Sequence, residues 1–250
     1  MADLKIHKFT YSPAAILAMS DDRRSSFLLL GLFLNEVNWL QKLLIMGMPD
    51  ERHDPEPVMQ SNLSLAILMT KLLAGKIHAG GERLRDQPLR TLLSVINLSK
   101  RGRELELKLV AALEKNSTIH RIRKSSAFHY PRNLTLAEPL PAQEELALYL
   151  TPHVGDALVH LSDLATVEAL VSAPGMNHKE LIVAFDLMLH KVIDATGVYT
   201  EFLVEVIKAV VDEIPEAPIQ QELLLLDAEP LDAVRPKFFA LPVIENSNYD

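Results

Sequence analysis

The amino-acid sequence predicts an all-α fold, a multi-helix bundle in which long helices surround one hydrophobic core. Apolar residues recur at helical intervals through most of the chain, and no run of alternating residues indicates a strand. The 250 residues suffice for one large core, and 48% hydrophobic with 23% charged residues is typical of a globular protein. We therefore expect a helical domain over residues 1–214 and a Pro-containing C-terminal tail over residues 215–250, packed on the domain or partly disordered.

Six helical segments are expected after an N-terminal arm of mixed polarity. Their ranges are 22–46, 58–78, 88–98, 100–128, one or two helices within 144–172, and 177–211. Ser20 offers the first an N-cap, Gly80-Gly81 is a stop signal for the second, and Pro88 suits the first turn of the third. Pro131 ends the fourth, because the residue before a proline disfavours helical geometry, and Asn177 can cap the last.

The residues expected to face the core follow from the same periodicity. They are Phe33, Val37, Leu40 and Leu44 in the first helix, Leu65, Met69 and Leu72 in the second, Leu105, Leu109, Ala112, Leu113, Ile119 and Ile122 in the fourth, and Leu181, Phe185, Met188, Val192 and Phe202 in the last. Glu36 interrupts the first of these stripes, and a buried carboxylate is costly without a cation. We expect Arg121 or Arg123 to supply that cation; alternatively, Asn35, Glu36 and Asn38 form a solvent-facing stripe.

Composition and charge exclude several classes of function. The chain contains no cysteine, which excludes disulfides and thiolate metal sites and fits a reducing, cytoplasmic location. Its longest apolar stretch, from Phe27 to Leu34, falls well short of the roughly 20 residues of a membrane span, so neither export nor membrane insertion is expected. A net charge of -8 argues against a broad cationic surface for duplex DNA, although a local RNA site is compatible with it.

The segment from Arg121 to Tyr130 is the most informative for function. Arg123 and His129 would lie about 240° apart on a continuous helix, but a chain that leaves the helix near Phe128 can bring the imidazole back toward the guanidinium. Such a pair combines a titratable acid or base with a permanent cation that grips phosphate. His120, one turn earlier, and Lys124 are expected to belong to the same basic patch.

An arginine followed at this interval by histidine, at the end of a long helix, resembles the motif of the HEPN superfamily. The wider context, Leu34-Asn35-Glu36-Val37-Asn38-Trp39-Leu40 and Ala127-Phe128-His129-Tyr130, also resembles a group of uncharacterised bacterial all-α proteins. The resemblance implies a homodimer in which Arg123 and His129 of two protomers meet in a groove and cut RNA without metal. Active members usually place a small polar residue after the arginine, where this sequence has Lys124.

A different pattern is ligand-like for a metal. His153, Asp156, His160 and Asp163 would share one face of a helix, although the complementary apolar stripe predicts that this face points outward.

Two functions therefore remain after the sequence alone. One is a metal-independent ribonuclease, or RNA-binding protein, without cofactor and suited to toxin or defence systems, in which Arg123 and His129 act with Glu36, Asn35, Lys124, Arg121, Tyr130 and His120 in support. The other is a non-catalytic helical scaffold that binds a protein partner.

Overall fold

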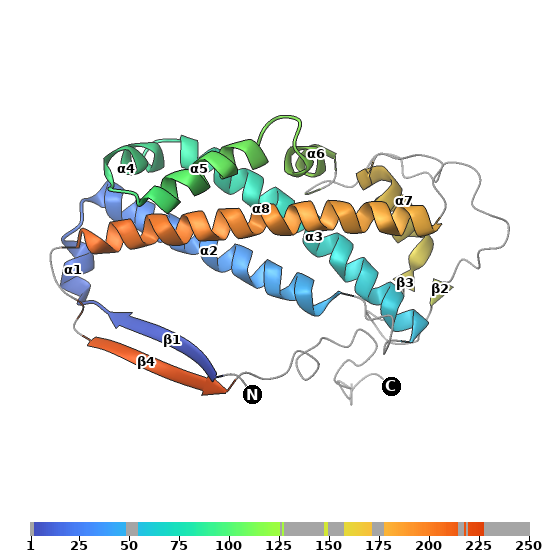
Figure 1. Ribbon diagram of the computed structural model, residues 1–250, viewed down its shortest axis with the longest axis horizontal. Helices are drawn as coiled ribbons and strands as arrows, with labels where there is room; N and C mark the ends of the chain where they lie inside the picture. The colour runs from blue at the N-terminus through green and yellow to red at the C-terminus, as the bar shows by residue number, and fades with distance from the viewer. Residues whose placement is uncertain are drawn as a thin grey trace, which may run out of the picture.

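The computed structural model describes residues 3–48, 55–125, 127, 148–149, 158–171, 178–214, 218 and 220–227. These residues form a predominantly helical fold, which confirms the all-α prediction (Figure 1). The helices are α1 (Pro13–Leu17), α2 (Asp21–Met46), α3 (Glu56–Arg85), α4 (Leu89–Val95), α5 (Lys100–Ala112), α6 (Thr118–Ser125), α7 (His160–Val171) and α8 (His178–Asp212). The short strands are β1 (Asp3–Thr10), β2 (Leu148–Tyr149), β3 (Leu158–Val159) and β4 (Gln220–Asp227).

The two longest helices, α3 and α8, form the centre of the bundle. Both contact α2 and α7, and both contact α6. Figure 1 shows α8 along the length of the molecule, with α2 below it and with α5 and α6 above it. The predicted stripe of α8 is correct, because Leu181, Phe185, Met188, Val192 and Phe202 are all buried.

Helix α2 buries one narrow seam. Leu30, Val37 and Leu44, spaced seven residues apart, are almost fully buried, and Phe33 and Leu40 pack beside the core as predicted. By length and composition, both α2 and α3 could cross a membrane, a test that core helices of soluble proteins also pass. They differ in burial, since 61% of the apolar window of α3 is buried in the structure but only 17% of that of α2. Much of the apolar surface of α2 is therefore uncovered by the described residues.

The glycine pair in α3 does not end the helix, contrary to the sequence prediction. Helix α3 continues through Gly80 and Gly81 to Arg85. A Cβ atom at Gly80 would overlap the Tyr199 hydroxyl of α8, and one at Gly81 would overlap Leu113 at the end of α5. The glycines therefore serve close packing on two sides of α3 rather than a C-cap.

The expected long helix over 100–128 is two helices, α5 and α6. The chain turns between them, where the Ser117 amide donates to the carbonyl of Glu114. The Ser117 hydroxyl then accepts a hydrogen bond from the His120 amide at 3.2 Å, which caps the start of α6. Of the predicted inward residues of both pieces, Leu105, Leu109, Leu113, Ile119 and Ile122 are nevertheless buried, and Ala112 is partly buried against the core.

An antiparallel ribbon joins the two ends of the described chain, contrary to the expectation of no strands. Strand β1 pairs with β4 from Asp3 opposite Asp227 to Thr10 opposite Gln220. The two strands lie more than 200 positions apart in the sequence, so neither carries a hairpin signal, and the run of four leucines in β4 does not alternate. Part of the expected tail thus pairs with the N-terminal arm.

The glycine contact generates a stability prediction. Gly80→Ala should lower the free energy of unfolding by about 1–3 kcal/mol, because the new methyl group overlaps the buried Tyr199 ring system. Gly197→Ala is the matched control, since nothing lies within 4 Å of a Cβ atom there, and it should stabilise α8 by about 0.5–1 kcal/mol. Urea unfolding followed by circular dichroism measures both. Equal effects of the two substitutions would contradict the packing role of Gly80.

Candidate functional site

Two histidines from different helices meet where α6 packs on α3. The Nε2 atom of His78 lies 3.1 Å from Nδ1 of His120, and the ring centroids are 5.2 Å apart. His78 is buried, with 8% of its surface exposed, whereas His120 is half-buried. The buried residues Ile119 and Ile122 anchor α6 and so hold His120 against α3.

A carboxylate lies on the other side of His78. Oε2 of Glu82, one turn later in α3, lies 3.5 Å from Nδ1 of His78, at the outer limit of a hydrogen bond. In the tautomer with its proton on Nδ1, His78 turns an N–H group toward this carboxylate, and its Nε2 accepts a hydrogen bond from Nδ1 of His120. That arrangement leaves the Nε2 lone pair of His120 able to accept a proton. In that tautomer the contacts run in one direction, from Glu82 through His78 to His120.

Burial and the neighbouring charges determine the protonation of His78. Burial lowers the pKa of His78 below 6.5; Glu82 raises that pKa, and His120 and Arg123 lower it further. Removal from water disfavours the charged imidazolium. His78 is therefore neutral at physiological pH, as a hydrogen-bond acceptor toward His120 requires.

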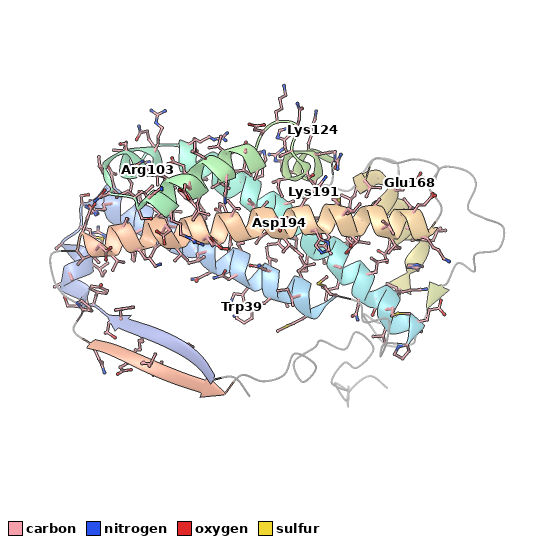
Figure 2. The ribbon with its side chains drawn as sticks, viewed as in Figure 1. Trp39, Arg103, Lys124, Glu168, Lys191 and Asp194 are labelled. Carbon is pink, nitrogen blue, oxygen red and sulfur yellow. The ribbon has the colours of Figure 1, made fainter. Side chains whose placement is uncertain are left out.

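Helix α6 places three cations beside this pair. Arg121, Arg123 and Lys124 are all exposed, and Arg123 is one turn beyond His120. Figure 2 shows Lys124 and Arg103 on the same side of the molecule, above α8. Residues 100–124 contain eight basic and three acidic residues, in a chain whose net charge is -8. Positive charge is therefore concentrated next to the histidine pair.

The predicted pairing of Arg123 with His129 falls outside the described residues, as do His129 and Tyr130. Helix α6 ends at Ser125, earlier than expected, and the amide of Ala127 donates to the carbonyl of Ile122 at 3.1 Å. The described histidine nearest Arg123 in the sequence is His120. The sequence places His120 beside Arg123 and Lys124, but no local pattern links it to His78, because the two histidines are 42 positions apart.

Glu36 pairs with a different cation from the one expected. Its Oε2 atom accepts a hydrogen bond from Nζ of Lys76 at 2.8 Å, so the prediction of Arg121 or Arg123 as its partner is wrong. Both side chains are more than one third exposed, and they line a hollow of about 180 Å³ with Gly80 and Tyr199. Burial, with Glu36 nearby, raises the pKa of Tyr199. Asn35, next to Glu36, is exposed on α2 and does not belong to the histidine site.

The expected histidine and aspartate face is not a single helical face. Residues 158–159 form β3, and α7 begins only at His160. His160 is buried rather than outward, and Asp163 accepts a hydrogen bond from Ser64 while burial raises its pKa. His153 and Asp156 lie outside the described residues. In the part of the chain that the structure describes, no three His, Asp or Glu side chains are arranged to hold a metal ion.

Comparisons of the sequence and of the structure with known proteins find no match. No protein-family model matches the chain, and no curated protein or solved structure matches it.

The lowered pKa of His78 predicts how stability depends on pH. The unfolded chain binds a proton at His78 more readily than the folded chain does. The neutral imidazole therefore contributes fully to the free energy of unfolding above about pH 6.5, and this contribution is lost as the pH falls below that value. We expect the free energy of unfolding to decrease on acidification from neutral pH, by at most about 1.4 kcal/mol per pH unit for one proton.

Two variants separate the contribution of His78 to the pH dependence of unfolding from that of the other groups. His78→Gln should flatten the pH dependence, whereas Glu82→Gln should steepen it, because Glu82 raises the pKa of His78. Chemical unfolding across the acid range measures these slopes. Parallel curves for the wild type and His78→Gln would contradict the assignment.

Proposed function

We propose that the protein binds single-stranded RNA on the basic face of α5 and α6 and cleaves it without a metal, with His120 as the general base. The observation that carries this proposal is the 3.1 Å contact between His78 and His120, backed by Glu82 and flanked by exposed Arg123. A carboxylate and a buried imidazole that orient a second, more exposed imidazole are a common way to activate a base.

The proposed reaction is an internal attack by the ribose. Nε2 of His120 takes the proton of the 2′-hydroxyl, and the 2′-oxygen bonds to the adjacent phosphorus. The 5′-oxygen of the next nucleotide leaves and receives a proton, which gives a 2′,3′-cyclic phosphate and a 5′-hydroxyl. Arg123 stabilises the negative charge that builds up on the phosphoryl oxygens.

The HEPN resemblance supports the same chemistry through a different histidine. It assigns the acid or base role to His129, with Arg123 as the shared cation, and it suggests a cytoplasmic toxin or defence protein. In the proposal His129 is the candidate that protonates the leaving 5′-oxygen. Separate substitutions of His120 and His129 distinguish the two assignments.

A non-catalytic binding protein is the second candidate. The observation that favours it is the exposed apolar surface of α2, which resembles an interaction surface more than a substrate site. In that case the histidine pair only joins α6 to α3, and RNA is bound without being cut or is not bound at all.

The cleavage proposal predicts a loss of rate in specific variants. His120→Gln and Arg123→Ala should each slow cleavage of a labelled single-stranded RNA by about 100-fold or more, in buffer that contains a chelator. His190→Gln, an exposed histidine of α8, is the matched control and should cleave at the wild-type rate. The product should carry a 2′,3′-cyclic phosphate. Cleavage that survives in His120→Gln would reject His120 as the base.

The binding surface makes a separate prediction about salt. Replacing Arg121 and Lys124 together by alanine removes two phosphate contacts, so the slope of log K against log salt should fall by about 1.4 for single-stranded RNA. The double change of Lys8 and Lys208, both exposed and outside α5 and α6, should leave that slope unaltered. Fluorescence anisotropy at several salt concentrations measures both. Equal slopes would place the RNA elsewhere.

A further inference from the structure

Helix α2 carries a second apolar stripe on the side opposite its buried seam. Four large residues of this stripe are exposed: Leu28 by 61%, Leu32 by 51%, Trp39 by 65% and Leu43 by 37%. At 100° per residue they point roughly opposite to the buried Leu30, Val37 and Leu44. A helix that is apolar on both sides normally has a partner on both sides, and among the described residues this stripe has none.

The stripe is symmetric about its own centre. Leu28 and Leu43 are equally far from the point between Asn35 and Glu36, and so are Leu32 and Trp39. When two copies of a helix pack antiparallel about a twofold axis, residues equidistant from the axis face each other. Leu32 would then pack on Trp39 of the other copy, and Leu28 on Leu43, over a length of about 22 Å.

The polar residue at the centre fits the same arrangement. Asn35 is exposed at one edge of the stripe and lies half a residue from the centre, so its two copies would come together on one side of the twofold axis. A paired central asparagine is known to fix the register of packed helices. Lys42, at the edge of the stripe, lies 5.5 Å from the Trp39 ring and covers it only in part.

The ribbon of β1 and β4 also lacks a covering layer among the described residues. Phe9 and Leu223 are exposed by 55% and 54%, and a two-stranded ribbon alone is marginally stable in water. The ribbon lies on the side of α2 toward which Trp39 points (Figure 2). A second copy seated on α2 would therefore lie against the ribbon as well.

We infer that the protein forms a homodimer through antiparallel packing of α2 against α2 of a second copy. The internal symmetry of the stripe favours this occupant over the chain's own residues 228–250 and over a lipid surface, since neither of those requires symmetry. Trp39 and Lys124 point to opposite sides of the molecule (Figure 2). The dimer thus places the two α6 helices on outer surfaces, far from each other. This arrangement differs from the shared groove that the HEPN resemblance implies. The inference does not depend on the proposed RNA cleavage.

The absence of cysteine allows a direct test of the geometry. Asn35→Cys should form a disulfide-linked dimer on mild oxidation, because the two copies of this position meet at the axis. Leu28→Cys alone should not cross-link, because its copies lie at opposite ends of the interface, but mixed Leu28→Cys and Leu43→Cys proteins should. Cross-linking of Leu28→Cys alone would indicate a parallel pair and overturn the proposal, as would the failure of Asn35→Cys to cross-link.

Solution mass measurements complete the test. Light scattering after size exclusion should give a dimer for the wild type, and Trp39→Asp should weaken dimerisation by at least about 30-fold. Leu187→Asp, on α8 and 61% exposed, is the matched control and should remain dimeric. Circular dichroism checks that each variant is folded.

Three results would overturn the inference. They are a monomeric wild type, a dimer that appears only when residues 228–250 are removed, and a monomer that binds phosphatidylcholine vesicles through Trp39. The second would identify those residues as the cover of α2, and the third would identify a membrane surface.

Discussion

The packing of Tyr199 of α8 against Gly80 of α3 is the contact on which the arrangement of the central helices depends. Because Gly80 has no side chain, the fully buried Tyr199 ring of α8 reaches the backbone of α3. The next residue, Gly81, admits Leu113 from the end of α5 in the same way. The two glycines allow α8 and the end of α5 to approach α3 closely. His78 and Glu82, on the same turns of α3, are positioned by this packing.

The spacing of apolar residues predicts most of the helices. It does not predict two features, the continuation of α3 through its glycine pair and the β1–β4 ribbon. The apolar repeats correctly predict the burial of Val37, Phe185 and Val192, since each lies in a long amphipathic helix. The glycine pair in α3 predicts a helix end, because glycine is common after the last turn of a helix. Glycine also permits close packing, and the local sequence does not separate the two roles. The β1–β4 ribbon joins distant segments, so no local pattern announces it.

The sequence predicts the basic residues of the candidate site but not its histidine pair, because that pair also joins distant segments of the chain. The basic residues Arg121, Arg123 and Lys124 are adjacent in sequence, so their concentration is visible without a structure. The partner of His120 is not, because His78 belongs to another helix and only the packing of α6 on α3 joins them. Pairing of Glu36 with Lys76 likewise depends on how α2 crosses α3. Contacts between helices, rather than the order of residues along one helix, assemble the candidate site.

The direction of the hydrogen bond between His78 and His120 is the measurement that tests the proposed function most directly. Nitrogen-15 NMR of the histidine rings, assigned with single His→Gln variants, reports which ring nitrogen carries the proton in each residue. The account predicts that His120 donates from Nδ1 and that His78 accepts at Nε2, with the proton of His78 on Nδ1 at neutral pH. A proton on Nε2 of His78, in either its neutral or its charged form, would contradict it.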